Sequence, residues 1–220
     1  MTNDKTLHGL IIKAQSGFFT AETEQGPVVC QLRGKLKQGK AKGDIAALGD
    51  RVQITVLEDG SGVIEEVEKR KQAIVRLDPR PNGVYQQVLL ANADQAVFVF
   101  ACAHPDPKLR MLDRFLVIAE KQRISPVIVA NKIDLVEDAK QIFGLYESIG
   151  YRVIYTSTKT GAGVDKLHDT LKNKISALAG PSGAGKSSLL NAIQPGLGLA
   201  VNEISTAMGK GKHTTVTRQM

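Results

Sequence analysis

The chain has 220 residues and a mass of 23.7 kDa, which allows one large domain or, as the better expectation, two smaller ones. Hydrophobic residues make up 42% and charged residues 23%, which excludes wholesale disorder. Two cysteines are too few for a disulfide framework or a four-cysteine zinc site, and this usage is typical of a reducing cytoplasm. The N-terminus lacks the apolar segment of a signal peptide, and the longest apolar run is too short to cross a membrane. We therefore expect a soluble cytoplasmic protein with no membrane partner.

The charge balance is basic, with 29 Lys and Arg against 22 Asp and Glu, a net charge of +7 and a pI near 9.4. Such an excess favours polyanionic partners such as nucleic acid, and a basic solvated surface is the alternative. Aromatic residues make up only 5% and Trp is absent, so we expect RNA contacts to be made through phosphates rather than through stacked bases.

The first part of the chain contains short runs rich in β-branched residues and separated by glycines. Strands are predicted at residues 7–14, 17–23, 27–32, 50–57 and 62–67. This series of antiparallel strands predicts a small closed barrel, with an OB-fold as the first candidate. An SH3-like barrel would give nearly the same pattern.

A basic segment, Arg33–Gly43, lies between the third and fourth predicted strands. Its candidate RNA-binding residues are Arg33, Lys35, Lys37, Lys40 and Lys42. So many charges cannot lie in a core, which leaves either a solvated loop or a loop that grips phosphates on a nucleic-acid-binding barrel.

A proline-containing connector at residues 78–83 precedes a change of pattern. We predict an OB-fold-like barrel over residues 1–70, a linker over 71–85 and a second domain over 86–220. In the second domain, buried strands are expected at 95–100, 126–130, 151–156 and 174–179. Helices are expected between and after them, at 108–121, 137–149, 164–171 and 186–194. This alternation predicts a mainly parallel sheet covered by helices.

One detail of the predicted packing concerns the helix at 137–149. Its apolar residues Ile142, Leu145 and Ile149 recur at helical spacing, and we expect them to face inward.

The strongest motif is GPSGAGKS at Gly180–Ser187, which follows a predicted strand and opens a predicted helix. Its glycines let backbone N–H groups surround phosphates, and the positive end of the helix adds to that field. Lys186 is expected to reach the β and γ phosphate oxygens, and the Ser187 hydroxyl is expected to bind Mg²⁺. The predicted phosphate-binding residues are Gly180, Pro181, Ser182, Gly183, Ala184, Gly185, Lys186, Ser187 and Ser188.

A second motif, Asn131-Lys132-Ile133-Asp134, follows the predicted strand at 126–130. Asp134 can accept hydrogen bonds from N1–H and the N2 amine of guanine, a donor pair that adenine lacks, so it is the expected guanine selector. Asn131 is expected to tie this loop to its neighbours, and the stem of Lys132 is expected to lie along the base. A loop with a helix-capping Asn and Asp is the alternative.

A third segment, TSTKTGAG at residues 156–163, follows the next predicted strand. It is similar to the small polar loop of GTPases, whose usual core is Ser-Ala-Lys, and Ser157, Thr158 and Lys159 are the corresponding candidates. The base-reading loops thus precede the phosphate loop, the reverse of the ordinary order. Because all three loops still share one sheet edge, the sequence predicts an α/β P-loop GTPase domain with circularly permuted motifs.

With the permuted loops, the preceding barrel and the segments NADQ (92–95) and LDRFL (112–116), the chain resembles the bacterial small-ribosomal-subunit biogenesis GTPases, the RsgA family. The resemblance covers nearly the whole chain. It implies a cytoplasmic GTPase that binds the small (30S) ribosomal subunit and its rRNA late in assembly and is stimulated by it.

The segment at residues 209–217 matches the first switch of that family. The resemblance implies that Thr214 or Thr215 closes over Mg²⁺ and the γ-phosphate, and that His213 positions the attacking water. A flexible basic loop with an incidental His is the alternative. The family continues with an Asp-x-x-Gly loop and a zinc domain, so we expect either a fragment or a naturally short protein, with Zn²⁺ only if the chain continues past Met220.

The overall expectation is a monomeric GTPase that uses GTP/GDP and Mg²⁺. Two alternatives stay open. One is a non-catalytic RNA-binding module that uses guanine nucleotide for stability, and the other is an ATPase or small-molecule kinase.

Overall fold

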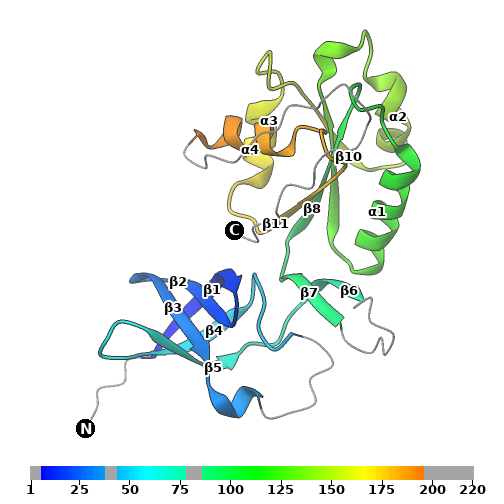
Figure 1. Cartoon of the computed structure of the whole chain (residues 1–220). Coiled ribbons are helices and arrows are strands. Elements are labelled where there is room, and N and C mark those ends of the chain that lie inside the picture. The colour runs from blue at the N-terminus through cyan, green and yellow to red at the C-terminus, as the bar shows by residue number, and fades with distance from the viewer. Residues whose placement is uncertain (1–5, 38–43, 78–85, 196–220) are drawn as a thin grey trace. The chain divides into compact units, whose positions relative to one another are not determined.

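The computed structural model describes residues 6–37, 44–77 and 86–195 of the chain (Figure 1). These residues belong to two compact units that meet in the sequence between Ala93 and Asp94. None of the helices in the described ranges combines the length and the apolar character needed to cross a bilayer.

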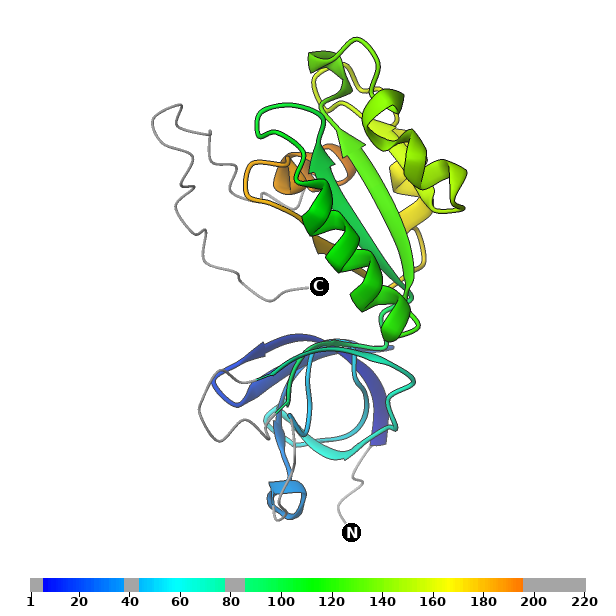
Figure 2. The same ribbon diagram turned by 90° about the vertical axis from the view of Figure 1, so that its right-hand side faces the viewer.

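The first unit contains a closed barrel, which Figure 2 shows curled around its core. Its strands are β1 (Thr6–Gln15), β2 (Phe18–Thr23), β3 (Gly26–Leu32), β4 (Arg51–Val56) and β5 (Gly62–Val67). The order around the barrel is β1-β2-β3-β5-β4, and the β3–β5 pair is parallel while the other pairs are antiparallel. One parallel closure in a barrel of this order is typical of an OB-fold, so the expected OB-fold-like barrel is confirmed.

Alternation along the strands fills the barrel interior. The fully buried side chains of the interior come from β1, β2, β4 and β5, and they are Ile11, Ala21, Val52, Ile54 and Ile64. Residues between them face outward, so each strand supplies one face to the core and one to the surface.

The expected linker at residues 71–85 is partly a strand. β6 (Ala73–Leu77) pairs antiparallel with β7 (Gln86–Ala91), and both belong to the first unit. Arg70 anchors this pair of strands through a 2.7 Å ion pair with the fully buried Asp50, and the Asn92 side chain donates to the carbonyl of Gly49 at 2.9 Å. The two strands on either side of the proline-containing segment therefore pair with each other, and the division between the two units falls later in the chain.

The second unit is an α/β sandwich. Its sheet contains β8 (Gln95–Ala101), β9 (Ser125–Asn131), β10 (Arg152–Thr156) and β11 (Ser176–Ala179) in the order β10-β9-β8-β11, with every pair parallel. Its helices are α1 (Leu109–Lys121), α2 (Lys140–Ser148), α3 (Val164–Leu171) and α4 (Lys186–Ile193). The predicted alternation of strands and helices is therefore confirmed.

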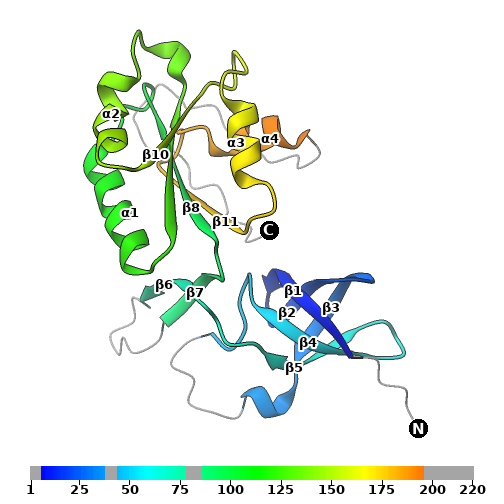
Figure 3. The same ribbon diagram turned by 180° about the vertical axis from the view of Figure 1, so that it is seen from behind.

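Helices cover both faces of this sheet (Figures 1 and 3). On one face, Val97 and Val127 pack with Leu167 of α3 and Leu189 of α4. On the other face, covered by α1 and α2, the ring of Phe98 lies 5.3 Å from that of Phe115 in α1. Burial on both faces explains why the strands read as continuous apolar runs.

The predicted inner face of α2 was wrong. Leu145 and Ile149 are 69% and 62% exposed and Ile142 is half-buried, whereas Phe143 and Tyr146 are buried. Phe143 and Tyr146 form the inner face instead, and the Tyr146 hydroxyl donates to Asp113 of α1 at 2.7 Å. Apolar spacing alone could not reveal that contact.

Candidate nucleotide-binding site

The three predicted loops leave the same edge of the sheet, because the strands that precede them are parallel. β9 ends at Asn131, β10 ends at Thr156, and the phosphate loop follows β11. Thr156 lies beside Asn131 in the strand register, which places the two base-reading loops side by side.

Asn131 joins all three loops. Its side chain is 1% exposed, and its Nδ2 donates to the carbonyl oxygen of Ala184 at 2.9 Å, across 53 positions of sequence. Its Oδ1 accepts from the Thr156 hydroxyl at 3.0 Å. One buried amide therefore fixes both base-reading loops against the phosphate loop.

Gly185 shows how closely these loops approach. A Cβ atom on Gly185 would lie 2.2 Å from Nδ2 of Asn131, and the residue has φ +93°. Both the contact and the backbone conformation require glycine. Gly185 is thus required both by the close approach of the Asn131 side chain and by the left-handed backbone of the turn.

Asp134 is oriented by a neighbouring loop. The buried Ser157 hydroxyl donates to Oδ1 of Asp134 at 2.6 Å, and it accepts from the backbone N–H of Thr160 at 3.2 Å. Asp134 itself is exposed, so its carboxylate is held in position and still open to a ligand.

Lys132 extends from the end of β9 to the loop after β8. Its backbone is left-handed, with φ +62°, and its ammonium donates to the carbonyl oxygen of His104. Burial lowers the pKa of Lys132, and the nearby Asp134 carboxylate opposes that shift.

The phosphate loop holds a cation, Lys186, that has only neutral partners among the residues that the structure describes. Nζ of Lys186 donates to the carbonyl oxygens of Gly180 at 2.9 Å and Pro181 at 2.8 Å. Burial lowers the pKa of Lys186, and among the described residues no carboxylate forms an ion pair with it. A half-buried ammonium with only neutral partners fits a loop made for an anion.

The first turn of α4 completes this candidate anion-binding site. The helix begins at Lys186, its first turn contains no acidic residue, and Ser187 and Ser188 are half-buried there. Free N–H groups and a hydroxyl oxygen at a helix N-terminus suit phosphate and a hard cation such as Mg²⁺.

The remaining predicted residues differ in position. Ile133 is half-buried in a short 3₁₀ helix, and Thr158 and Lys159 are exposed on the loop after β10. The catalytic candidates His213, Thr214 and Thr215, with Lys40 and Lys42 of the basic segment, lie outside the described residues.

The described part of the basic segment is paired with one acid. Nη1 of Arg33 lies 2.7 Å from Oε2 of Glu65 on β5, and Nζ of Lys35 lies 3.8 Å from the same oxygen. Lys35 and Lys37 lie in the short 3₁₀ helix Gly34–Lys37, which directly follows Arg33. Two of the predicted RNA-binding cations are therefore already partnered.

Sequence reasoning missed Thr156 and the carbonyl of His104. The sequence could have indicated Thr156, because a polar side chain at the end of a buried strand needs a hydrogen-bond partner, and the structure shows that Thr156 is buried. The His104 contact had no sequence signal, because any residue supplies a carbonyl.

Comparisons with known proteins identify the family. The family model described as RsgA GTPase matches residues 67–220, and the model described as RsgA N-terminal domain matches residues 8–64. The chain belongs to the RsgA GTPase family. The contacts of Asn131 with its neighbouring loops therefore belong to a member of this family. In this chain the base-reading motif precedes the phosphate loop.

Curated relatives agree with this assignment. The Small ribosomal subunit biogenesis GTPase RsgA of Geobacillus sp. (strain WCH70) is 42% identical over 212 residues, which cover 94% of this chain and 68% of the relative. The protein of the same name from Gemmatimonas aurantiaca is 43% identical, with 98% of this chain and 71% of the relative covered. The chain spans about two thirds of the length of these relatives.

Solved structures confirm the permuted fold. YjeQ from Thermotoga maritima matches with a TM-score of 0.72 and 40% identity, covering 88% of this chain and 66% of that protein. YloQ, a circularly permuted GTPase, matches with a TM-score of 0.68 and 33% identity, covering 90% and 68%. The predicted RsgA-type architecture, a barrel followed by a permuted GTPase domain, is therefore correct.

Proposed function

We propose that this chain binds and hydrolyses GTP, releasing GDP and phosphate, during maturation of the small (30S) ribosomal subunit. The observation that carries the proposal is the hydrogen bond from Asn131 to Ala184, because it joins the base-reading loop to the phosphate loop. A single nucleotide can then contact both. The names of the relatives, which refer to small-subunit biogenesis and to GTPase activity, support the same conclusion.

Guanine is selected by Asp134. Its carboxylate accepts from N1–H and the N2 amine of the base, while Ser157 keeps it from rotating. Lys132 and Ile133 line the base, and Thr158 and Lys159 offer backbone N–H groups to the guanine carbonyl oxygen.

The phosphates bind to the loop at residues 180–188. Backbone N–H groups hold their oxygens, and Lys186 exchanges its carbonyl partners for the β and γ oxygens. The Ser187 hydroxyl is the proposed Mg²⁺ ligand of α4, with Thr215 as a second. When bound, Mg²⁺ supplies positive charge against the phosphate oxygens.

Hydrolysis depends on positioning and charge stabilisation more than on covalent chemistry. Lys186 stabilises charge on the transferred group, and His213, with Thr214 and Thr215, is proposed to order the attacking water. Turnover by the chain alone is expected to be slow, with the ribosomal subunit completing the site.

The partner is the small subunit and its rRNA, contacted through phosphates by Arg33, Lys35, Lys37, Lys40 and Lys42. The protein acts as a monomer in the cytoplasm. Zn²⁺ is proposed only for a protein that continues past Met220.

The direct test is GTP turnover measured with and without purified small ribosomal subunits. We expect subunits to raise the rate, and Lys186→Ala to abolish that increase. The matched control is Lys166→Ala, at an exposed lysine of α3, which should retain most of the increase. Tight GDP binding without turnover under either condition would instead support the non-catalytic RNA-binding module.

A further inference from the structure

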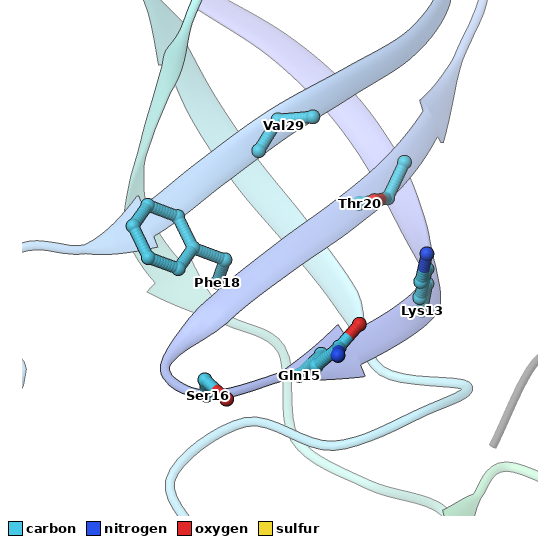
Figure 4. A pocket seen from close by; sticks show the side chains of 6 residues that line it. All are labelled: Lys13, Gln15, Ser16, Phe18, Thr20 and Val29. Carbon is cyan, nitrogen blue, oxygen red and sulfur yellow. The ribbon is translucent and has the colours of Figure 1, made fainter. Parts of the chain in front are cut away.

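The outer face of the barrel carries a shallow groove of about 290 Å³ that the nucleotide site does not use. Figure 4 shows the side chains that line it. They come from β1, β2, β3 and the β1–β2 turn, and they are Lys13, Gln15, Ser16, Phe18, Thr20 and Val29. The groove therefore lies entirely within the first unit.

Phe18 is the unusual residue of this groove. It is 50% exposed, whereas the other five phenylalanines of the chain are buried or half-buried. The adjacent Phe19 already fills the barrel interior at 7% exposure, because successive strand residues face opposite sides. Packing of the barrel thus does not require an aromatic ring at Phe18, and the exposed ring offers a flat face on which a base can stack.

The surroundings of Phe18 suit a flat, negatively charged ligand. Val29, which is 53% exposed, lies opposite Thr20 on β3, and Lys13 lies opposite Thr20 on β1. None of the six lining residues is acidic. On β2, the nearest acidic residue whose side chain faces outward is Glu22. It lies two residues after Thr20, at the end of the strand away from Phe18.

Basic residues also follow the Phe18 end of the groove. Phe18 pairs with Gln31 of β3, and the chain continues from there to Arg33 and Lys35, two cations that share the single carboxylate of Glu65. An aromatic ring between Lys13 on one side and this basic segment on the other is the combination used for single-stranded nucleic acid. The β2–β3 face and the β1–β2 loop are also the surfaces that OB-folds use for oligonucleotides.

We propose that this groove binds one unpaired RNA base, stacked on Phe18, with the flanking phosphate paired to Lys13. The proposal rests on the proposed function, since it specifies how the barrel contacts rRNA, and it adds a stacking contact to binding that is otherwise electrostatic. A protein partner is disfavoured because specific protein interfaces need about 800 Å² per side, whereas only Phe18 and Val29 offer large apolar side chains here.

The absence of Trp from the sequence allows a direct spectroscopic test with the full chain. In Phe18→Trp the new indole is the single tryptophan, and stacking on a base should quench its fluorescence when single-stranded RNA is added. Leu57→Trp is the matched control, because Leu57 is 43% exposed and lies at the turn after β4. Quenching in Phe18→Trp that is no larger than in Leu57→Trp, or that duplex RNA of the same length reproduces, would overturn the proposal.

Affinity gives a second, independent measurement. Phe18→Ala should weaken binding of a single-stranded RNA oligonucleotide by about 5- to 150-fold, and Leu57→Ala should leave it unchanged. Lys13→Gln should lower the slope of log affinity against log salt by about 1, whereas Phe18→Ala should not change that slope. Thermal unfolding of each variant checks that the barrel is intact. If Phe18→Ala binds RNA normally but binds intact small subunits more weakly, the groove contacts a protein and the proposal is wrong.

GTP turnover in the same preparations separates this inference from the proposed function. Normal subunit-stimulated turnover without RNA quenching in Phe18→Trp would remove only the stacking site. Quenching in Phe18→Trp together with no stimulation of the wild-type chain by subunits would remove only the proposed function.

Discussion

The proposed nucleotide site and the basic segment of the barrel hold their polar and charged side chains in different ways. At the nucleotide site, Asn131 and Ser157 are buried and hydrogen-bonded to neighbouring loops, so the geometry exists before a ligand binds. In the basic segment, the side chains of Arg33 and Lys35 are 54% and 63% exposed and share one carboxylate, Glu65. Buried bonds provide specificity, whereas exposed charges provide salt-dependent affinity.

The largest effect should come from Asp134→Asn. The amide presents a donor to a guanine N–H and removes the charged acceptor, so GDP affinity should fall by about 100-fold or more and xanthine nucleotides should be preferred. Competition of GDP, XDP and ADP against a fluorescent nucleotide measures this. Unchanged preference for guanine would mean that Asp134 does not read the base.

The next effect should come from Asn131→Ala, which leaves the Ala184 carbonyl and the Thr156 hydroxyl without their buried partner. We expect the free energy of unfolding to fall by about 2–4 kcal/mol and GDP affinity to fall by about 10- to 100-fold. Urea unfolding and nucleotide titration measure the two effects. Thr158→Ala, on the exposed part of the neighbouring loop, should change stability by less than about 0.5 kcal/mol.

Ser157→Ala should have a smaller and more selective effect. Asp134 loses its anchoring hydrogen bond but keeps its charge, so the preference for GDP over ADP should fall about tenfold. Ser157→Thr retains a hydroxyl and should restore much of that preference. Equal loss of GDP and ADP binding in Ser157→Ala would indicate a general structural defect instead of a role in orienting Asp134.

The smallest effects should lie in the basic segment. Glu65→Gln releases Arg33 and Lys35 and should strengthen RNA binding by up to about fivefold at low salt. Arg33→Gln should lower the salt slope of RNA binding by about 1. Filter binding over a salt series measures both variants. If neither variant changes RNA affinity, the described part of this segment does not contact RNA.

These differences also explain which features the sequence could predict. Short strands with glycine turns, buried parallel strands and the two nucleotide motifs all depend on local pattern, and the structure reproduces the barrel and the α/β sheet. The sequence also led us to expect that Asn131 ties its loop to neighbouring loops, but it did not identify Ala184 as the partner.

What the sequence could not predict depends on partners distant in the chain. β6 and β7 lie on either side of the proline-containing segment in the sequence, and their place in the first unit depends on Asp50 and Gly49. The inner face of α2 depends on the bond from Tyr146 to Asp113, which no spacing rule encodes.

Hydrogen exchange with and without GDP tests most directly whether one guanine nucleotide contacts both loops. If one nucleotide contacts both, GDP slows amide exchange at residues 180–188 and also at residues 131–134 and 157–159, while pyrophosphate protects residues 180–188 alone. Protection by GDP that is confined to residues 180–188 would contradict this shared contact.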